Sequence, residues 1–216
     1  MPTKKDREKR QSIIDACRSM NALGINQGTS GNISLRHGEG LLITPTSTPY
    51  EAMQPEQIVF MDLDGSHDPA QRPSSEWRFH LEILKARPEI NAVVHAHPTY
   101  STILAIMGLE IPPIHYMIAC AGGDTIRVAP YATFGTQELS EHAVRALEGR
   151  LACLLEHHGM IAVGASLSKA MWLAVEVETL ARQYHGCLQI GKPPLLPSDE
   201  IERVRQRMAG YGMSDG

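Results

Sequence analysis

The stretch that decides the fold reads Val93-Val94-His95-Ala96-His97-Pro98. Its apolar, β-branched start predicts a buried strand over residues 92–97. Side chains alternate across a strand, so His95 and His97 should leave the same face of the sheet. A lone histidine on a strand is usually a hydrogen-bonded core residue. Two such imidazoles on one face would each need a buried partner, which favours binding of a divalent metal by the pair.

A third imidazole is available in Leu155-Glu156-His157-His158-Gly159. Neighbouring residues of a strand point to opposite faces, so only one of these two histidines should join the first pair. We predict that it is His158, because Gly159 beside it lets the chain turn and the backbone come close. His157 is expected to support the site or the core instead.

The fourth expected ligand is Glu76, in Pro73-Ser74-Ser75-Glu76-Trp77, at the start of a predicted helix that Ser74 or Ser75 can cap. Three histidines and one carboxylate would fill a tetrahedral zinc site. A weakly held carboxylate can leave the metal when an oxygen-rich substrate arrives and then act as a base. The alternative is an acid that is simply favoured by the helix dipole.

Small donor residues gather in three segments, at residues 28–32, residues 44–47 and Ser74-Ser75. Hydroxyls, backbone N–H groups and a helix N-terminus can hold a phosphate without a lysine. Each segment alone is better explained as a turn or a cap. Together with the metal cluster they indicate a small phosphorylated metabolite, while the absence of a GxxxxGK[ST] motif excludes a nucleotide P-loop.

Outward from these segments, hydrophobic periodicity predicts an alternation of helices and strands. Helices are expected over residues 5–23, 75–87, 99–107 and 136–147, from Ser166 onward, and once more after Pro197. Strands are expected over residues 33–36, 41–43, 58–62, 92–97, 151–155 and 161–163, with a further strand within 112–130. The predicted class is α/β, with one domain over residues 1–216 and a central, mixed or antiparallel sheet between helices on both faces.

Composition excludes several classes of partner. The formal net charge is −4, and acids interrupt the only basic cluster, at residues 4–10, so nucleic acid is not an expected partner. No apolar run reaches the length of a membrane span, and no secretory signal is recognisable. The four cysteines form no CxxC pair and are expected to be reduced thiols in the core. These features indicate a cytoplasmic protein.

Seven runs of residues resemble one family when taken together. They are residues 23–29, 42–46, 73–80, 91–95, 114–119, 130–135 and 157–159. With these runs the chain resembles the class II aldolase/adducin superfamily, and within it the L-fuculose-1-phosphate aldolases. The resemblance covers nearly the whole chain and thins over about the last twenty residues. It implies a largely antiparallel central sheet and a homotetramer whose active sites lie between subunits.

The resemblance also implies roles for individual residues. Zn²⁺ would be held by His95, His97 and His158, with Glu76 as the movable fourth ligand and catalytic base. Tyr116, reaching in from the neighbouring subunit, would protonate the aldehyde oxygen. The phosphate-binding residues that it implies are Gly31, Asn32, Thr46, Ser47, Ser74 and Ser75. Mn²⁺ or Co²⁺ could take the place of zinc in such a site.

The chain departs from the family pattern at two places. Ser47 stands where glycine is expected, and a positive φ there would strain the phosphate loop. Met208 stands where an aromatic residue is expected, whereas Tyr211 matches. Phe134, Met208 and Tyr211 are the expected residues of the aldehyde side of the pocket.

The implied reaction cleaves a ketose 1-phosphate, with L-fuculose 1-phosphate as the first expectation, to dihydroxyacetone phosphate and an aldehyde through a metal-stabilised enediolate. An aldolase for 5-deoxy- or 5-methylthio-pentulose 1-phosphates is the nearest alternative, because Ser47 and Met208 leave the substrate's far end open. Pentulose-phosphate epimerases and a dehydratase share the metal site, but Tyr116 and its segment favour the aldolase. A non-catalytic, adducin-like interaction domain is disfavoured because the four expected ligands are intact.

Overall fold

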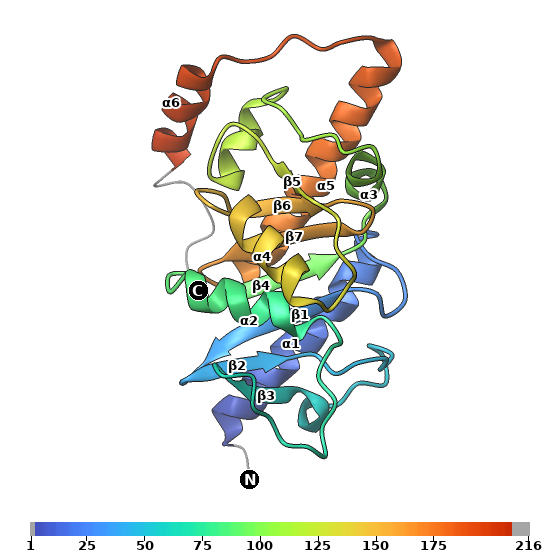
Figure 1. Cartoon of the computed structure of the whole chain (residues 1–216), viewed down its shortest axis with the longest axis vertical. Helices are drawn as coiled ribbons and strands as arrows, with labels where there is room; N and C mark the ends of the chain where they lie inside the picture. Colours follow the sequence, from blue (N-terminus) through green and yellow to red (C-terminus); the bar gives the residue numbers. More distant parts are fainter. Residues whose placement is uncertain (1–2, 209–216) are drawn as a thin grey trace.

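A seven-stranded sheet forms the centre of the protein in a computed structural model that describes residues 3–208 (Figure 1). The strand order is β3-β2-β1-β4-β7-β6-β5, and every neighbouring pair is antiparallel except β5 and β6. The strands are β1 (Asn32–His37), β2 (Gly40–Ile43), β3 (Val59–Asp62), β4 (Ala92–Ala96), β5 (Arg127–Ala129), β6 (Ala152–Leu155) and β7 (Gly159–Gly164). The expected single domain with a mostly antiparallel sheet is confirmed.

Helices cover both faces of this sheet, as predicted. In Figure 1, α2 (Trp77–Ala86) and α4 (Gln137–Ala146) lie in front of it. The opposite face is covered by α1 (Lys4–Ala22), α3 (Thr99–Ile106) and α5 (Leu167–Ile190). The C-terminal α6 (Ser198–Met208) packs on the 3-10 helix η2 (Tyr116–Ala121), and a second 3-10 helix, η1 (Pro55–Gln57), precedes β3.

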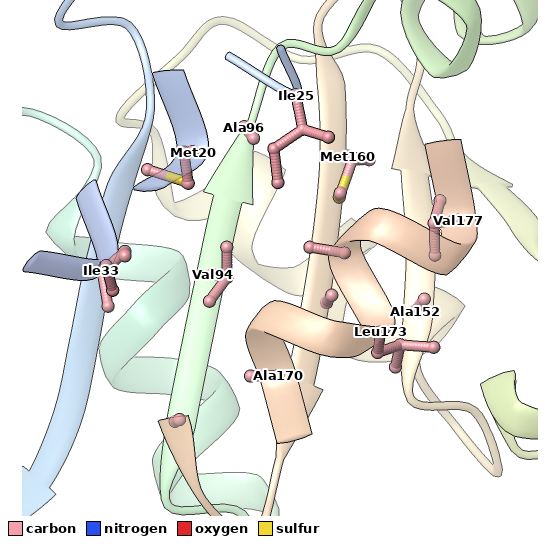
Figure 2. Close-up of a cluster of buried hydrophobic side chains, with 14 of the residues drawn as sticks. Met20, Ile25, Ile33, Val94, Ala96, Ala152, Met160, Ala170, Leu173 and Val177 are labelled. Carbon is pink, nitrogen blue, oxygen red and sulfur yellow. The ribbon is translucent and has the colours of Figure 1, made fainter. Parts of the chain in front are cut away.

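Two apolar layers, one on each face, hold the sheet in place. Figure 2 shows the layer beneath α5, where Leu173 lies beside Ala152 on β6. Val177 of the same helix belongs to one cluster with Val94 on β4 and Met160 on β7. On the other face, Phe79 of α2 packs with residues of β2, β3 and β4. Burying such side chains contributes roughly 25 cal/mol for each Å² of apolar surface removed from water. The central strands β4 and β7 are thereby fixed from both sides, and these strands position the site.

Helix boundaries follow the capping signals in the sequence. Thr136 and Ser166 cap α4 and α5, each accepting a hydrogen bond from the third residue of its helix. α2 is an exception, because it starts at Trp77, later than predicted, with Glu76 as its N-cap and without a side-chain cap, so the expected cap from Ser74 or Ser75 is wrong. The Ser74 hydroxyl instead accepts from the backbone N–H of Glu76. The 3-10 helix η2 was not anticipated within residues 112–130.

The cysteines and the helices bear on the compartment predictions. All four cysteines are free thiols: Cys17 and Cys153 are buried and Cys120 packs against the core, as predicted, whereas the core prediction is wrong for Cys187. Burial raises the pKa of Cys17 and of Cys153 to about 12, which keeps both thiols protonated. Within residues 3–208, no helix has the length and apolarity needed to cross a membrane.

Candidate active site

Four side chains from three segments meet at one end of the sheet. His95 lies on β4 and His97 follows the end of that strand, His158 lies in the turn between β6 and β7, and Glu76 is the N-cap of α2. One ligand atom from each of the four lies within 4.8 Å of all the others. The structure therefore brings together the complete set of predicted ligands.

Hydrogen bonding fixes the tautomer of His95. Its Nδ1 lies 2.9 Å from the carbonyl oxygen of Met160, which can only accept, so Nδ1 carries the proton. The Nε2 atom of His95 therefore points into the cluster, and it lies 2.9 Å from Nε2 of His97. Burial, together with the neighbouring His95, lowers the pKa of His97 to about 3, which favours the neutral form of the His97 ring. Two imidazole nitrogens that face one another at this distance are suited to share a cation.

Glu76 supplies the negative charge of the cluster. Its Oε2 lies 3.2 Å from His95 Nε2, and its Oε1 lies 3.1 Å from His158 Nε2. The buried Oε1 accepts no hydrogen bond of good geometry. Burial opposes ionisation, but His95 and His158 outweigh it and hold the pKa of Glu76 below its usual range. An ionised, partly unsatisfied carboxylate beside three imidazoles fits a divalent cation such as Zn²⁺.

The turn before β7 separates the two neighbouring histidines. His157 has φ of +55° and is exposed, while His158 is turned inward to the cluster. His158 is the ligand candidate as predicted, but the prediction that His157 supports the site or the core is wrong. Neither residue lies on a strand, so the left-handed conformation of His157, and not strand alternation, produces the difference. Gly159 is required beside it, because a Cβ there would lie 2.5 Å from the carbonyl oxygen of Ala96.

The segments predicted to bind phosphate adjoin one another. The backbone N–H of Thr46 donates to Arg72 O and that of Ser74 donates to Thr44 O, so the segments around residues 44–47 and 72–75 run side by side. Residue 31 lies against β4, where a Cβ at Gly31 would lie 2.7 Å from His95 O. Ser75 is exposed, whereas Ser74 is buried and its hydroxyl binds the backbone of Glu76. The cradle thus borders the cluster, with the Ser74 hydroxyl bound to the backbone N–H of Glu76, the N-cap of α2.

Ser47 adopts the conformation that glycine would favour. Its φ is +52°, and its hydroxyl lies 3.4 Å from that of Thr46. Serine in the left-handed region carries a steric cost that glycine lacks. The strain anticipated for this position is present.

Asn32 has a different environment from the one expected for a phosphate ligand. Its Nδ2 donates to Glu76 Oε2 at 2.9 Å, and its Oδ1 lies 2.5 Å from Nε2 of His80. His80 was not singled out from the sequence, although it lies one helical turn after Glu76 and therefore on the same helix face. Burial, with a contribution from His95, lowers the pKa of His80 to about 3.

Two further residues that the sequence analysis missed support the segment around His97. The Oδ1 atom of Asn26 accepts from the backbone N–H of His97 at 3.3 Å. Glu178 on α5 accepts from the backbone N–H groups of Tyr100 and Ser101, each at 2.8 Å, and so satisfies the start of α3. Both contacts join segments that are far apart in the sequence, so no local sequence pattern predicts them.

The remaining predicted site residues lie apart from the cluster of their own chain. Tyr116, which is 50% exposed, and Met208 line a pocket of about 1090 Å³ together with Gly164, at the far end of β7 from Gly159. Six strand residues at about 3.3 Å each place the two ends of β7 roughly 16 Å apart. Phe134 is 63% exposed and precedes Gly135, which touches Ser75 on the cluster side. Tyr211 lies outside the described residues.

Comparison with known proteins yields a consistent set of relatives. A family model described as the class II aldolase and adducin N-terminal domain matches residues 11–185. A 5-methylthioribulose-1-phosphate/5-deoxyribulose-1-phosphate aldolase of Rhodospirillum rubrum is 55% identical over 94% of this chain and 92% of its own length. An L-fuculose phosphate aldolase of Escherichia coli is 52% identical over 94% of this chain and 95% of its own. A solved structure of an L-fuculose 1-phosphate aldolase superimposes with a TM-score of 0.91 at 36% identity, covering 97% of this chain and 98% of that one.

Proposed function

The chain belongs to the class II aldolase and adducin family and is a class II aldolase, and from this premise we propose that it cleaves a ketose 1-phosphate to dihydroxyacetone phosphate and an aldehyde. The observation that carries the proposal is the convergence of Glu76, His95, His97 and His158 on one point. The family domain is proposed to extend over the whole chain, residues 1–216.

We propose that these four residues hold one divalent cation, with Zn²⁺ the first choice for three imidazoles and a carboxylate. Bound there, the cation supplies Lewis-acid stabilisation of the negative charge that develops on the substrate oxygens when the C3–C4 bond breaks. His95 keeps its metal-binding tautomer through the bond from Nδ1 to Met160 O.

Glu76 is the proposed base and acid at C3. In the direction of cleavage it gives a proton to C3 of the enediolate, and in the direction of condensation it removes that proton from dihydroxyacetone phosphate. Its depressed pKa supports an ionised resting state, and its unsatisfied Oε1 supports a carboxylate that is held lightly enough to move. Tyr116 is the proposed partner that takes the C4 hydroxyl proton in cleavage and returns it in condensation.

Tyr116 is proposed to act across a subunit boundary. It lies at the opposite end of β7 from the cluster of its own chain, where an exposed phenol lines an open pocket. A homotetramer, with each site built from two neighbouring chains, would join this end of one subunit to the cluster of the next. The same assembly would bring Met208 to the Phe134 side of a neighbouring site.

The phosphate is proposed to bind between residues 28–32, residues 44–47 and the N-terminus of α2, with Gly31, Asn32, Thr46, Ser47, Ser74 and Ser75 as its contacts. This cradle has backbone N–H groups and hydroxyls in place of a lysine. Its position beside Glu76 would put the substrate's C2 and C3 oxygens at the cluster when the phosphate is seated.

L-Fuculose 1-phosphate is the first proposed substrate, since the resemblance of the whole chain and the Escherichia coli relative support it. A 5-deoxy- or 5-methylthio-pentulose 1-phosphate is the second candidate, favoured by Met208 in place of an aromatic residue and by the Rhodospirillum rubrum relative. An apolar thioether in the pocket suits a methyl or methylthio end better than a polyhydroxylated chain. The free cysteines support a reducing compartment, for which we propose the cytoplasm.

The test is dihydroxyacetone phosphate release from both substrates, with the metal content of the same preparation measured. We expect about one divalent ion per chain, cleavage of at least one of the two substrates, and loss of turnover on exhaustive chelation that zinc restores. A kcat/KM ratio in favour of the 5-deoxy or 5-methylthio substrate would replace the first candidate by the second. Undiminished turnover after chelation would refute the proposed chemistry.

A further inference from the structure

A chain of hydrogen bonds links Glu76 to the interior on the face covered by α2. Ser34 Oγ lies 2.8 Å from His80 Nδ1, His80 Nε2 lies 2.5 Å from Asn32 Oδ1, and Asn32 Nδ2 lies 2.9 Å from Glu76 Oε2. Ser34 and His80 are fully buried, and Asn32 and Glu76 are each 5% exposed. The four side chains therefore interact with one another instead of with water.

The direction of every bond in this chain is determined by chemistry. An ionised carboxylate can only accept, so the Asn32 amide must point its Nδ2 at Glu76 and its Oδ1 at His80. The Oδ1 atom also only accepts, so His80 must carry its proton on Nε2. A neutral, buried ring then has a lone pair on Nδ1, and the Ser34 hydroxyl donates to it.

The backbone spacing makes this arrangement possible. Asn32 and Ser34 are two apart on β1 and share one face of the strand, while Glu76 and His80 are one turn apart on α2 and its N-cap. Each polar pair thus faces the other across the contact between strand and helix. The surrounding α2 residues Phe79, Ile83 and Leu84 belong to the apolar layer.

A buried polar chain of this kind is not required for packing. An apolar side chain of similar volume at residue 80 would avoid the desolvation of the imidazole and is commonly as stable or more so. The chain ends at Glu76, the group whose orientation matters most for the chemistry. We propose that His80 is a positioning residue that, backed by Ser34, fixes the orientation of the Asn32 amide and through it the place of the Glu76 carboxylate.

Without the His80 donor, the buried Oδ1 of Asn32 would have no partner, and the amide could turn its oxygen towards Glu76. Two oxygens would then face each other, and Glu76 would lose its place both as a ligand and as a base. His80→Leu removes the donor at similar volume. His80→Gln retains an amide N–H that can reach the position of Nε2.

The experiment measures metal affinity and steady-state kinetics in four variants. Zn²⁺ affinity is obtained by competition with a chromophoric chelator, and kcat and KM by dihydroxyacetone phosphate release. For His80→Leu we expect about 10-fold or weaker zinc binding and about a 10- to 100-fold lower kcat, with KM changed less than about 3-fold. His80→Gln should stay within about 3-fold of the wild type in both quantities.

Ser34→Ala and Ser140→Ala form a matched pair, because both serines are fully buried and only Ser34 belongs to the chain of bonds. Ser34→Ala should shift zinc affinity and kcat in the direction of His80→Leu by a smaller amount, and Ser140→Ala should leave both unchanged. If His80→Leu does not fold, the comparison of Ser34→Ala with Ser140→Ala tests the proposal. Equal zinc affinities in these two serine variants would overturn it. A folded His80→Leu with wild-type zinc affinity, or a His80→Gln variant as impaired as His80→Leu, also overturns it.

The inference rests on the proposed function only through the role of Glu76 as ligand and base. The zinc titration needs no substrate, so a wild-type protein that binds zinc but cleaves no ketose 1-phosphate would refute the proposed reaction and leave the positioning role to be judged by affinity. A rise in KM at constant kcat in His80→Leu would show that His80 acts on substrate binding and not on Glu76, and it would overturn the inference.

Discussion

The two ends of β7 carry two different kinds of surface. Near Gly159, three segments of the chain meet, and Glu76 and His158 lie there with His95 and His97 in a largely enclosed polar cluster. At Gly164 the chain opens into a broad pocket lined by Tyr116 and Met208, together with the exposed Trp172. The four clustered side chains at the first end all come from one chain, whereas at the second end an exposed Tyr116 lines an open pocket. Under the proposed function, the difference means that a single subunit supplies the metal ligands, while the proposed proton donor and aldehyde pocket would depend on assembly.

The largest expected effect concerns the buried end. Glu76→Gln should lower kcat by about 10³-fold or more, because the amide cannot carry the C3 proton. Three imidazoles remain, so the variant should still hold its metal. The checks are metal analysis and dihydroxyacetone phosphate release, with Glu82→Gln, the same change on the same helix, as the control. A fully active Glu76→Gln enzyme would remove Glu76 from the mechanism.

The next effect tests the open end. Tyr116→Phe should lower kcat by about 10²-fold through loss of the proton donor, with Tyr184→Phe on α5 as a control of equal chemistry. When inactive Tyr116→Phe and Glu76→Gln chains are mixed and refolded together, activity should return in the sites that take Glu76 from one chain and Tyr116 from the other. In a random mixture of a cyclic assembly this amounts to about one quarter of the sites. No recovery in verified hybrid oligomers would mean that both groups act within one chain.

A smaller effect concerns how the stability of the buried end depends on pH. The pKa of His80 is about 3 in the folded protein because of burial, with His95 adding to the shift, and it lies below the value of about 6.5 for a histidine in an unfolded chain. The stability that neutral His80 contributes is therefore complete above about pH 6.5 and is lost as the pH falls towards 3. Between pH 8 and pH 5 the metal-free wild type should lose about 2 kcal/mol more unfolding free energy than His80→Gln. Urea denaturation at both pH values measures this, and equal losses in the two proteins would contradict it.

The smallest effect concerns backbone strain beside the buried end. Ser47→Gly should raise the free energy of unfolding by about 0.5–1 kcal/mol, since glycine adopts a φ of +52° without steric cost. Ser66→Gly, an exposed serine outside the left-handed region, should give no such gain. If the Ser47 hydroxyl contacts the phosphate, the stabilised variant should also show a higher KM. A Ser47→Gly protein that is no more stable than the Ser66→Gly control would show that the loop carries no strain.

Much of the fold was predictable because its signals are local. The caps Thr136 and Ser166, the apolar stripe of α5 and the β-branched run of β4 each lie within a few residues and specify an element by periodicity. The 3-10 helix η2 and the start of α2 were missed, since the first lacks a periodic pattern and the second depends on which serine hydroxyl binds which backbone N–H.

The sequence by itself predicted the proposed ligand set, from strand alternation for His95 and His97, a glycine turn for His158 and a helix start for Glu76. It also marked Ser47 as a residue standing where glycine is expected. Only the tertiary structure decided that Asn32 binds Glu76 and His80, that Asn26 and Glu178 support the segment after β4, and that Tyr116 lies at the far end of β7. The physical reason is that these contacts join segments separated by tens of residues. Their geometry is set by how the helices pack on the sheet, which short-range patterning of side chains does not encode.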